Sequence, residues 1–365
     1  MHQDPAFLAD PEIRCREYRI GAIGAGFIMA DIHLVAYQWA GFPVCAIASR
    51  TSANAREVAA KRGIARVHET PEALLTDPDV DIVDIAFPPH LQGEIIEQAI
   101  RQPHIKGILA QKPLAMDYAD ARRIVDMCRD SGKILSVNQN MRYDQSMRVL
   151  KQILDRGDIG KPVTATIEMR AIPHWQGFLK KYDRLTLLNM SIHHLDVLRF
   201  LFGEVEEIST MARSDPRTGF AHTDGICISS LRFRNGVLGL SIDDIWASPT
   251  DEGFDSDTFI RWRVEGEKGL VKGTIGWPDY PDGSPSTLSY CAPSTGGKWV
   301  SPEWDTRWFP HAFAGVMEQL QYAVKTGEPP ALTGEDNLHT MALVEAAYRS
   351  IAERRAVRPE EIEQS

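Results

Sequence analysis

The stretch RIGAIGAGFIMADIH, residues 19–33, runs from a short apolar segment through two spaced glycines into a helical pattern. A strand, a glycine turn and a helix in this order predict a unit that binds a dinucleotide. Gly24 would make the tight turn, and Gly26 would let the backbone approach a pyrophosphate at the helix N-terminus. The third position of the glycine motif holds Met29, so the match is incomplete.

The chain continues this rhythm from residue 18 to about residue 138. Short apolar runs occupy 18–24, 42–49, 80–88, 105–110 and 133–137, and helical patterns occupy 29–40, 52–63, 91–102 and 118–132. Strands that alternate with helices predict a parallel sheet with right-handed crossovers. Because the apolar runs do not alternate with polar residues, both faces of this sheet are expected to be covered.

The pattern changes after Tyr143. A helix is predicted over 146–160, followed by extended segments at 162–172, 225–247 and 257–277. RNG and EGEKG lie within the last two segments, between apolar runs, and have the residue types of β-hairpin turns. The sheet after Tyr143 is therefore expected to be largely antiparallel. Two helices, 311–328 and 334–355, close the pattern, and Thr333 caps the second. The Pro-, Gly- and Ser-rich segment 278–299 is expected to be a surface loop.

Composition limits the kind of partner. A chain of 365 residues exceeds the size at which one core usually stops growing, so two domains are expected. The net charge of −10 argues against nucleic acid or an anionic membrane and favours a small molecule. The five cysteines lack metal or CxxC spacing and are interpreted as core thiols of a reducing compartment. No signal peptide or membrane-spanning run is evident, which favours the cytoplasm.

The second apolar run ends in AIASRTSANAR, residues 46–56. An acidic residue here would bind the 2′-hydroxyl of NAD. Ser49 and Arg50 instead could accept the 2′-phosphate of NADP or cover the adenine, so these residues favour NADP.

The segment AQKPLA, residues 110–115, follows the fourth apolar run. Lys112 would therefore lie at the carboxyl end of a central parallel strand, where open sheets bind ligands. Its ammonium could hydrogen-bond a substrate hydroxyl, and Pro113 would stiffen the turn, with a cis peptide as one option. The alternative is an ordinary salt-bridged surface lysine.

The segment TLLNMSIHHLDVLRFLFGEV, residues 186–205, predicts a helix with Asn189, His193 and Asp196 on one face. Histidine titrates near neutrality, so His193 could take a hydroxyl proton as hydride leaves the same carbon, with Asp196 orienting the imidazole. The alternatives are a structural histidine or a metal pair with His194. Adjacent helical positions point apart, so no metal is predicted.

Seven segments in order resemble the Gfo/Idh/MocA family of sugar and inositol dehydrogenases: GAIGAGFIMADIH, VDIVDIAFPPH, AQKPLA, NQNMRY, GDIGKP, NMSIHHLDVLRFLFG and VEAAYRSIAERRAV. The resemblance implies an α/β chain with an N-terminal Rossmann domain (17–140) and a C-terminal α/β domain (141–365). The second domain would carry an open, mostly antiparallel sheet that binds substrate and forms a homodimer or homotetramer, and its last helices would pack on the first. The resemblance favours NAD, while Ser49 and Arg50 leave NADP open.

The family's Glu-Lys-Pro motif falls on Gln111, Lys112 and Pro113, and its Asp-x-x-x-His pair falls on Asn189 and His193. The resemblance implies that the lysine contacts the reacting hydroxyl and the nicotinamide ribose, and that His193 is the acid/base. Gln111 and Asn189 both depart from the family's acids, and Gln92 replaces a common histidine. A neutral asparagine can bind a hydroxyl but cannot stabilise an imidazolium as a carboxylate would.

The candidate site residues fall into three groups. The predicted catalytic residues are Lys112 and His193. The predicted cofactor-binding residues are Gly24, Gly26, Phe27, Ile28, Ser49, Arg50, Pro88, His90, Gln111, Lys112 and Asn140. The predicted substrate-binding residues are Lys112, Arg142, Trp175, Asn189, His193 and Trp246, with Tyr143, His174 and Tyr182 as further candidates by position. Each aromatic residue has core or interface packing as its alternative role.

The expected function is oxidation of a sugar or polyol by an NAD(P)-dependent dehydrogenase, from cyclic aldose to lactone or from ring carbinol to ketone. One alternative is an NADPH-dependent keto-sugar reductase, to which Ser49 and Arg50 lend support. Another is a cofactor-binding regulator without catalysis, which Gln111 and Asn189 suggest.

Overall fold

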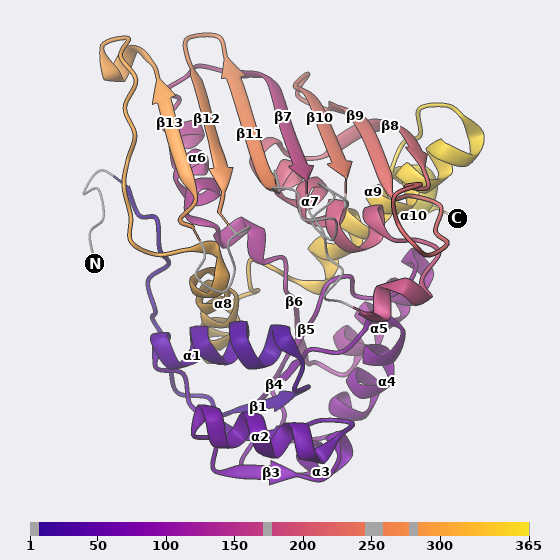
Figure 1. Cartoon of the computed structure of the whole chain (residues 1–365). Helices are drawn as coiled ribbons and strands as arrows, with labels where there is room; N and C mark the ends of the chain where they lie inside the picture. The colour runs from indigo at the N-terminus through magenta and orange to yellow at the C-terminus, as the bar shows by residue number, and fades with distance from the viewer. Residues whose placement is uncertain (1–6, 171–176, 245–257, 277–283, 365) are drawn as a thin grey trace. The chain divides into compact units, whose positions relative to one another are not determined.

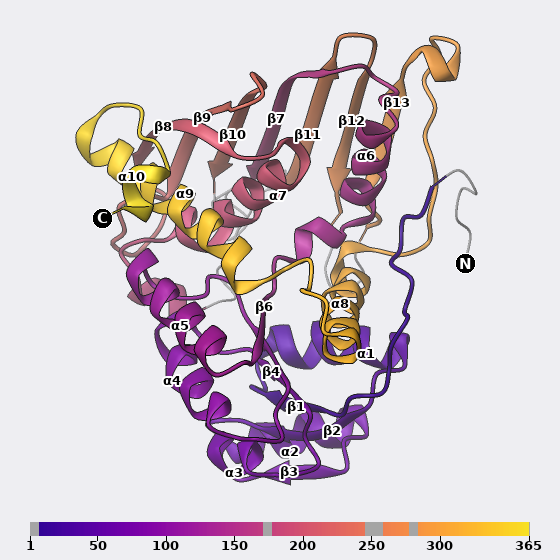
Figure 2. The ribbon, with the colours of Figure 1, turned by 180° about the vertical axis from the view of Figure 1, so that it is seen from behind.

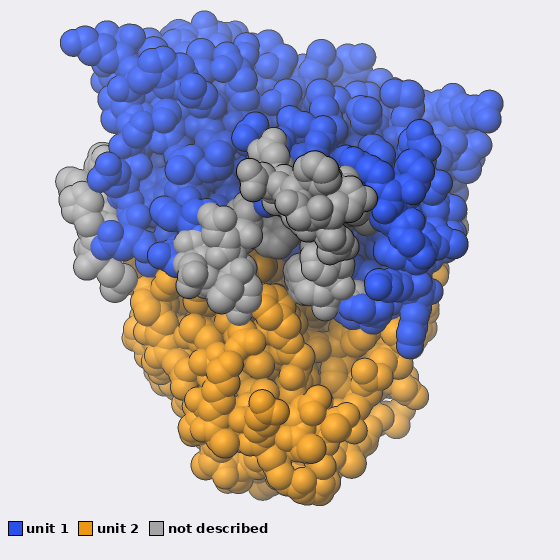
Figure 3. All heavy atoms as spheres, viewed as in Figure 1, with its two compact units in different colours: residues 1–10, 141–308, 339–365 blue, residues 11–140, 309–338 orange. Residues whose placement is uncertain are grey.

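The computed structural model describes residues 7–170, 177–244, 258–276 and 284–364. The chain divides into two compact units, coloured in Figure 3. Residues 11–140 and 309–338 form one, named here the parallel-sheet unit. Residues 1–10, 141–308 and 339–365 form the other, named here the mixed-sheet unit, to the extent that they are described.

The parallel-sheet unit contains six strands in the order β3-β2-β1-β4-β5-β6. All of their pairings are parallel, which confirms the predicted sheet. The strands are β1 Ile20–Ile23, β2 Val44–Ala48, β3 Arg66–His68, β4 Ile82–Ile85, β5 Gly107–Ala110 and β6 Ile134–Val137. The sequence pattern missed β3, which has three half-buried residues, and the short helix that follows it.

Helices cover both faces of this sheet, with α4 and α5 on one side and α1 and α8 on the other (Figures 1 and 2). In α5, Ala121, Ile124, Val125 and Cys128 recur at helical spacing and are buried, and the Asp117 carboxylate caps its first turn. The helical elements are η1 Ile28–His33, α1 Leu34–Ala40, α2 Ser52–Arg62, α3 Pro71–Leu75, α4 Pro89–Ile100, α5 Tyr118–Asp130 and α8 Phe313–Thr326.

Helix α8 joins this unit from a distant part of the sequence through buried polar contacts. The Gln319 side-chain amide donates to the Ser136 hydroxyl of β6 at 2.6 Å, and its oxygen accepts the Leu332 N–H at 3.3 Å. The Ser136 hydroxyl in turn donates to the Leu332 carbonyl at 3.0 Å. A single glutamine therefore satisfies polar groups on β6 and on the chain that leaves α8.

The mixed-sheet unit contains seven strands in the order β13-β12-β11-β7-β10-β9-β8. Only β10 and β7 pair in parallel, so the predicted, mostly antiparallel sheet is confirmed. The strands are β7 Pro162–Arg170, β8 Val205–Arg213, β9 Ile226–Phe233, β10 Leu238–Asp244, β11 Phe259–Gly266, β12 Leu270–Ile275 and β13 Thr287–Cys291.

Strand β13 corrects the prediction of one long surface loop over 278–299. Residues 287–291 pair with β12, and Leu288 and Tyr290 alternate into the core. The prolines, glycines and serines around this short strand concealed the alternation.

The long helices of the mixed-sheet unit lie on one face of its sheet (Figures 1 and 2). Asp144 caps α6, whose buried face includes Val149, Leu150 and Ile153. Thr333 caps α9 as predicted, because its hydroxyl accepts the Asp336 N–H at 3.0 Å. The helical elements are η2 Asn140–Tyr143, α6 Gln145–Asp155, η3 Gly177–Lys181, η4 Leu187–Ser191, α7 Ile192–Phe202, η6 Pro293–Thr295, α9 Gly334–Glu353 and α10 Glu360–Glu363. Most of η7 Trp308–Ala312 and the first residues of α9 belong to the parallel-sheet unit.

All five cysteines carry free thiols, and Cys15, Cys128 and Cys227 are buried. Burial raises the pKa of the Cys128 thiol to about 12, which makes it a poor nucleophile at neutral pH. Within the described ranges, no helix combines the length and the apolar character that a membrane crossing requires.

Replacing Gln319 with alanine is expected to lower the free energy of unfolding by about 1–3 kcal/mol, because buried polar groups lose a partner. The urea midpoint measures this change. Gln38→Ala is the matched control, since the Gln38 amide donates to the Arg62 carbonyl at an exposed position of α1. Equal midpoints for the two variants would contradict the role assigned to Gln319.

Candidate functional site

The carboxyl ends of parallel strands gather the predicted cofactor residues of the parallel-sheet unit. Gly24 follows β1, Ser49 follows β2, Pro88 lies beyond β4, and Gln111 follows β5. The strand order reverses between β1 and β4, which is the point where sheets of this topology bind ligands.

The glycine turn has the backbone geometry that the sequence predicted. Gly24 has a φ of +122°, and a Cβ there would lie 2.8 Å from the Ala86 carbonyl oxygen, so a side chain is excluded. A Cβ on Gly26 would meet no atom within 4 Å, so its backbone lies open to a ligand. Phe27 is the N-cap residue of the helix, and its side chain makes no capping hydrogen bond. These features fit a dinucleotide pyrophosphate bound at the first turn.

The departure at Met29 coincides with an unusual helix start. Met29 is fully buried, and the helix opens as the π turn η1, with Ile28 as its first residue, before continuing as α1. π turns widen a helix locally and are frequent at functional sites. Met29, where the glycine motif is incomplete, thus lies in a π turn, which is wider than an α-helical turn. The features that fit a dinucleotide are the backbone geometries of Gly24 and Gly26.

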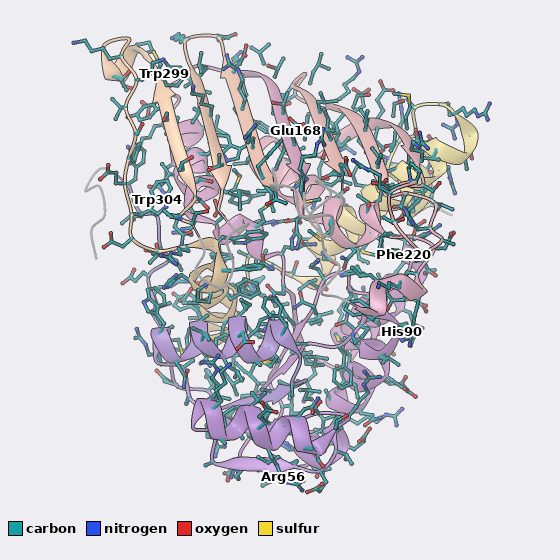
Figure 4. All side chains as sticks on the ribbon, viewed as in Figure 1. Arg56, His90, Glu168, Phe220, Trp299 and Trp304 are labelled. Atoms are coloured by element: carbon teal, nitrogen blue, oxygen red, sulfur yellow. The ribbon has the colours of Figure 1, made fainter. Side chains whose placement is uncertain are left out.

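Two further segments flank the turn. Arg50 is exposed, and its guanidinium carbon lies 6.0 Å from the centre of the Phe87 ring. Pro88 precedes α4 as its N-cap, and His90 is exposed in the first turn of that helix (Figure 4). Arg50 therefore presents an exposed guanidinium after β2, at the place where sites selective for NAD have an aspartate or glutamate.

The loop that carries Lys112 is held by Gln92, a residue that sequence reasoning singled out only as a departure. The Gln92 amide nitrogen donates to the carbonyls of Gln111 at 2.8 Å, Pro113 at 2.7 Å and Leu114 at 2.8 Å. Its oxygen accepts the Gln111 N–H at 3.0 Å. One buried amide thus fixes the whole loop, in which the Lys112–Pro113 peptide is cis, the option the sequence left open.

Lys112 follows β5 directly, and its environment differs from that of a solvated surface lysine. The side chain is partly exposed, but burial lowers the pKa of its ammonium to about 7. Desolvation disfavours the charged form, and position 111 supplies a neutral amide rather than a carboxylate. At neutral pH, Lys112 can therefore exist as ammonium or as amine.

The segment after β6 adds amide groups. The Asn140 amide donates to the carbonyl and to the side-chain oxygen of Asn138, both at 3.3 Å. Gln139 is 2% exposed, and neither polar atom of its side chain has a hydrogen-bond partner within the described ranges. The buried amide of Gln139 could therefore hydrogen-bond a polar ligand. Gln139 was not among the site residues predicted from the sequence.

In the mixed-sheet unit, Asn189 and His193 lie on consecutive helical segments. Asn189 belongs to the π turn η4, and His193 lies in the first turn of α7. Both are buried, and the His193 ring packs edge-on against Trp308, with 6.0 Å between ring centroids. The predicted single helix is therefore two segments.

Asp224 fixes the start of this π turn and was not predicted. Its carboxylate accepts the N–H groups of Leu185 at 2.6 Å and Leu187 at 2.9 Å. The Tyr348 hydroxyl donates to the same carboxylate at 2.8 Å and accepts the Leu188 N–H at 3.2 Å. These bonds position the segment that carries Asn189, although burial raises the pKa of Asp224.

Asp196 does not orient His193, so that prediction is wrong. Its two carboxylate oxygens accept Nε and Nη2 of Arg142, both at 2.6 Å, and the Thr340 hydroxyl at 2.8 Å. Arg142 is correspondingly buried in a fork-shaped ion pair. The pair joins η2 to α7, and a substrate role for Arg142 stays a prediction.

The other candidates are placed as follows. The Tyr143 ring lies 5.8 Å from the guanidinium carbon of Arg148, and the Tyr182 ring packs edge-on against Phe178. Burial raises the pKa of Tyr182 to about 12. His194 lies 2.6 Å from Asp243, and within the described ranges no cluster of three or more His, Cys, Asp or Glu side chains could hold a metal ion. His174, Trp175 and Trp246 lie outside the described residues.

Family comparisons cover both parts of the chain. The model described as "Oxidoreductase family, NAD-binding Rossmann fold" of the Gfo/Idh/MocA family matches residues 18–139. The model of that family's C-terminal alpha/beta domain matches residues 151–358.

Individual proteins are similar over nearly their whole length. D-apiose dehydrogenase of Paraburkholderia graminis is 27% identical over 95% of this chain and 91% of its own. Myo-inositol 2-dehydrogenase of Thermotoga maritima is 28% identical over 94% of this chain and 99% of its own. The crystal structure of an oxidoreductase from Agrobacterium radiobacter in complex with NAD+, L-tartaric acid and magnesium is 24% identical, covers 95% of this chain and 99% of its own, and has a TM-score of 0.81. Because the two family models together match most of its residues, this chain belongs to the Gfo/Idh/MocA family of oxidoreductases.

Proposed function

We propose that this enzyme oxidises a CH–OH group of a sugar or polyol with NAD(P)+ as hydride acceptor. The observation that carries the proposal is Lys112, which Gln92 holds at the carboxyl end of β5 and whose ammonium pKa burial lowers to about 7. The names of the relatives, D-apiose dehydrogenase and myo-inositol 2-dehydrogenase, support a cyclic aldose or a ring carbinol as substrate.

The parallel-sheet unit would hold the cofactor, and a bound nicotinamide supplies the hydride acceptor. The backbone from Gly24 to Ile28 would bind the pyrophosphate through N–H groups at the helix start. The remaining contacts would come from Ser49, Arg50, Pro88, His90, Gln111 and Asn140. We assign cofactor binding to residues 17–140 and substrate binding to residues 141–365, with α8 as part of the cofactor-binding unit.

Lys112 and His193 would handle the substrate oxygen and its proton. The His193 imidazole accepts the hydroxyl proton as the carbon loses hydride, and the Lys112 ammonium donates a hydrogen bond to the same oxygen. Asn189 would bind a neighbouring hydroxyl, and Arg142, Trp175 and Trp246 would complete the substrate site. Since Asp196 is engaged by Arg142, His193 works without that carboxylate.

A second candidate is an NADPH-dependent keto-sugar reductase, favoured by the exposed Arg50 where an acid would select NAD. The same residues serve this reaction in reverse, with His193 returning the proton to the substrate oxygen. Turnover of pentoses, hexoses, branched sugars, inositols and their keto forms with each cofactor, followed by nicotinamide absorbance, separates the two directions. Cofactor binding without turnover of any of them would indicate a regulator.

Lys112→Met is expected to lower kcat/KM by roughly 10²-fold or more, because the developing charge on the substrate oxygen loses its donor. Lys106→Met is the matched control. Lys106 precedes the same strand at its amino end and pairs with Asp81 at the surface. Steady-state rates of both variants measure the effect, and equal rates would exclude Lys112 from catalysis.

The pH profile tests the same lysine. Because the ammonium is lost as pH rises through about 7, kcat/KM is expected to have a descending limb near that pH. Lys112→Arg keeps its charge, so this limb should move to higher pH. A limb that stays in place in Lys112→Arg would assign it to another group.

His193→Asn is expected to reduce kcat by roughly 10²–10⁴-fold while cofactor affinity stays unchanged, since the variant removes a proton acceptor and retains a polar side chain. Stopped-flow hydride transfer and cofactor fluorescence titration measure the two quantities. His339→Asn, at an exposed position of α9, is the control. A normal hydride-transfer rate in His193→Asn would contradict the proposed acid/base role.

Arg50→Ala is expected to raise KM for NADP+ by roughly tenfold or more and to change KM for NAD+ little, because a guanidinium contact to phosphate is lost. Arg56→Ala, on the exposed side of α2, is the control. Equal effects on both cofactors would show that Arg50 covers the adenine rather than a 2′-phosphate.

A further inference from the structure

His33 connects the buried interior of the parallel-sheet unit to the Lys112 loop. It is fully buried, and its Nδ1 lies 2.7 Å from Oδ2 of Asp84 on β4. The Tyr37 hydroxyl donates to the same carboxylate oxygen at 2.6 Å. Because an ionised carboxylate only accepts hydrogen bonds, the imidazole proton resides on Nδ1.

The other ring nitrogen faces two amide groups. Asn138 Nδ2 lies 3.0 Å and Gln111 Nε2 lies 3.4 Å from His33 Nε2. The orientation of the Gln111 amide is fixed independently, since its oxygen accepts the backbone N–H of Lys112 at 3.0 Å. The NH2 group of Gln111 therefore points toward His33, which requires an acceptor at Nε2 and hence a neutral ring.

We propose that His33 is a positioning residue for Lys112: held as the neutral Nδ1–H tautomer by Asp84, it accepts from Gln111 and thereby fixes the backbone of the lysine. The inference rests on the proposed catalytic role of Lys112. Gln111 suits this neutral imidazole, because its amide nitrogen is a donor that faces Nε2 beside the amide of Asn138. A glutamate there would place a carboxylate against a bare ring nitrogen and would draw a second proton onto His33.

The surroundings of His33 support this assignment. The titratable groups that face its ring in the described part of this unit are the Asp84 carboxylate and the Tyr37 hydroxyl, and the Phe313 ring of α8 packs 4.9 Å away. The two donors to the Asp84 oxygen are an N–H and an O–H group, so Nδ1 of the ring is engaged there and Nε2 remains to accept from the two amides.

Nitrogen-15 NMR of histidine-labelled protein tests the tautomer without any assay of turnover. In the wild type at neutral pH, His33 should show a protonated Nδ1 and a bare Nε2, and Gln111→Glu should convert it to a doubly protonated ring. A doubly protonated His33 in the wild type, or an unchanged ring in Gln111→Glu, would overturn the proposal. The NMR spectrum reports the protonation of His33 and does not depend on catalysis. It therefore tests the tautomer even if the Lys112→Met rates show that the proposed function is wrong.

Kinetics test the positioning role. His33→Asn should lower kcat by roughly ten- to a hundredfold through misplacement of the lysine loop, with the cofactor dissociation constant changed less than about twofold. His68→Asn is the matched control, since His68 also pairs with an aspartate, Asp77, at 3.0 Å, on β3. Gln111→Leu removes the hydrogen bond between Gln111 and His33 by changing the residue on the Lys112 loop. This variant replaces His33→Asn in the test if His33→Asn does not fold. An unchanged kcat in a folded variant of either kind would overturn the proposal.

Discussion

One buried amide constrains the loop on which the site depends. Residues 111–114 leave the sheet at the end of β5, and their backbone groups need partners where no strand or helix supplies them. The two N–H groups of the Gln92 amide are shared among three carbonyls of this loop, and its oxygen accepts one N–H. A histidine at this position would offer one donor and one acceptor in its neutral form and could not make this set of bonds.

Alternation of strand and helix was sufficient to predict the parallel sheet, because buried parallel strands are continuous apolar runs. The missed strands have physical reasons. Val205–Arg213 carries a register shift between Val205 and Glu207, which breaks the alternation on which a strand prediction depends. Arg66–His68 has no buried residue, and Thr287–Cys291 is surrounded by turn-forming residues.

The position of a candidate site residue was predictable where that residue follows the end of a parallel strand, as for Gly24 and Lys112. It was not predictable where the partner comes from a distant segment. Asp196 lies three residues from His193, yet it pairs with Arg142, 54 residues away in sequence. Asp224 is isolated in the sequence pattern and becomes important only because the N–H groups that begin the π turn converge on it.

Gln111 and Asn189 place neutral amides, rather than carboxylates, near Lys112 and His193, and this affects the protonation of the candidate site. In an ion pair, a neighbouring carboxylate raises the pKa of a lysine and keeps it protonated. At Lys112 burial lowers the pKa, and the adjacent Gln111 contributes orientation without charge. Asn189 likewise offers hydrogen bonds but no charge in the helical turn before His193. Burial is the cause of the lowered pKa of Lys112, so the pH range in which the enzyme works should respond to changes in packing around the Lys112 loop.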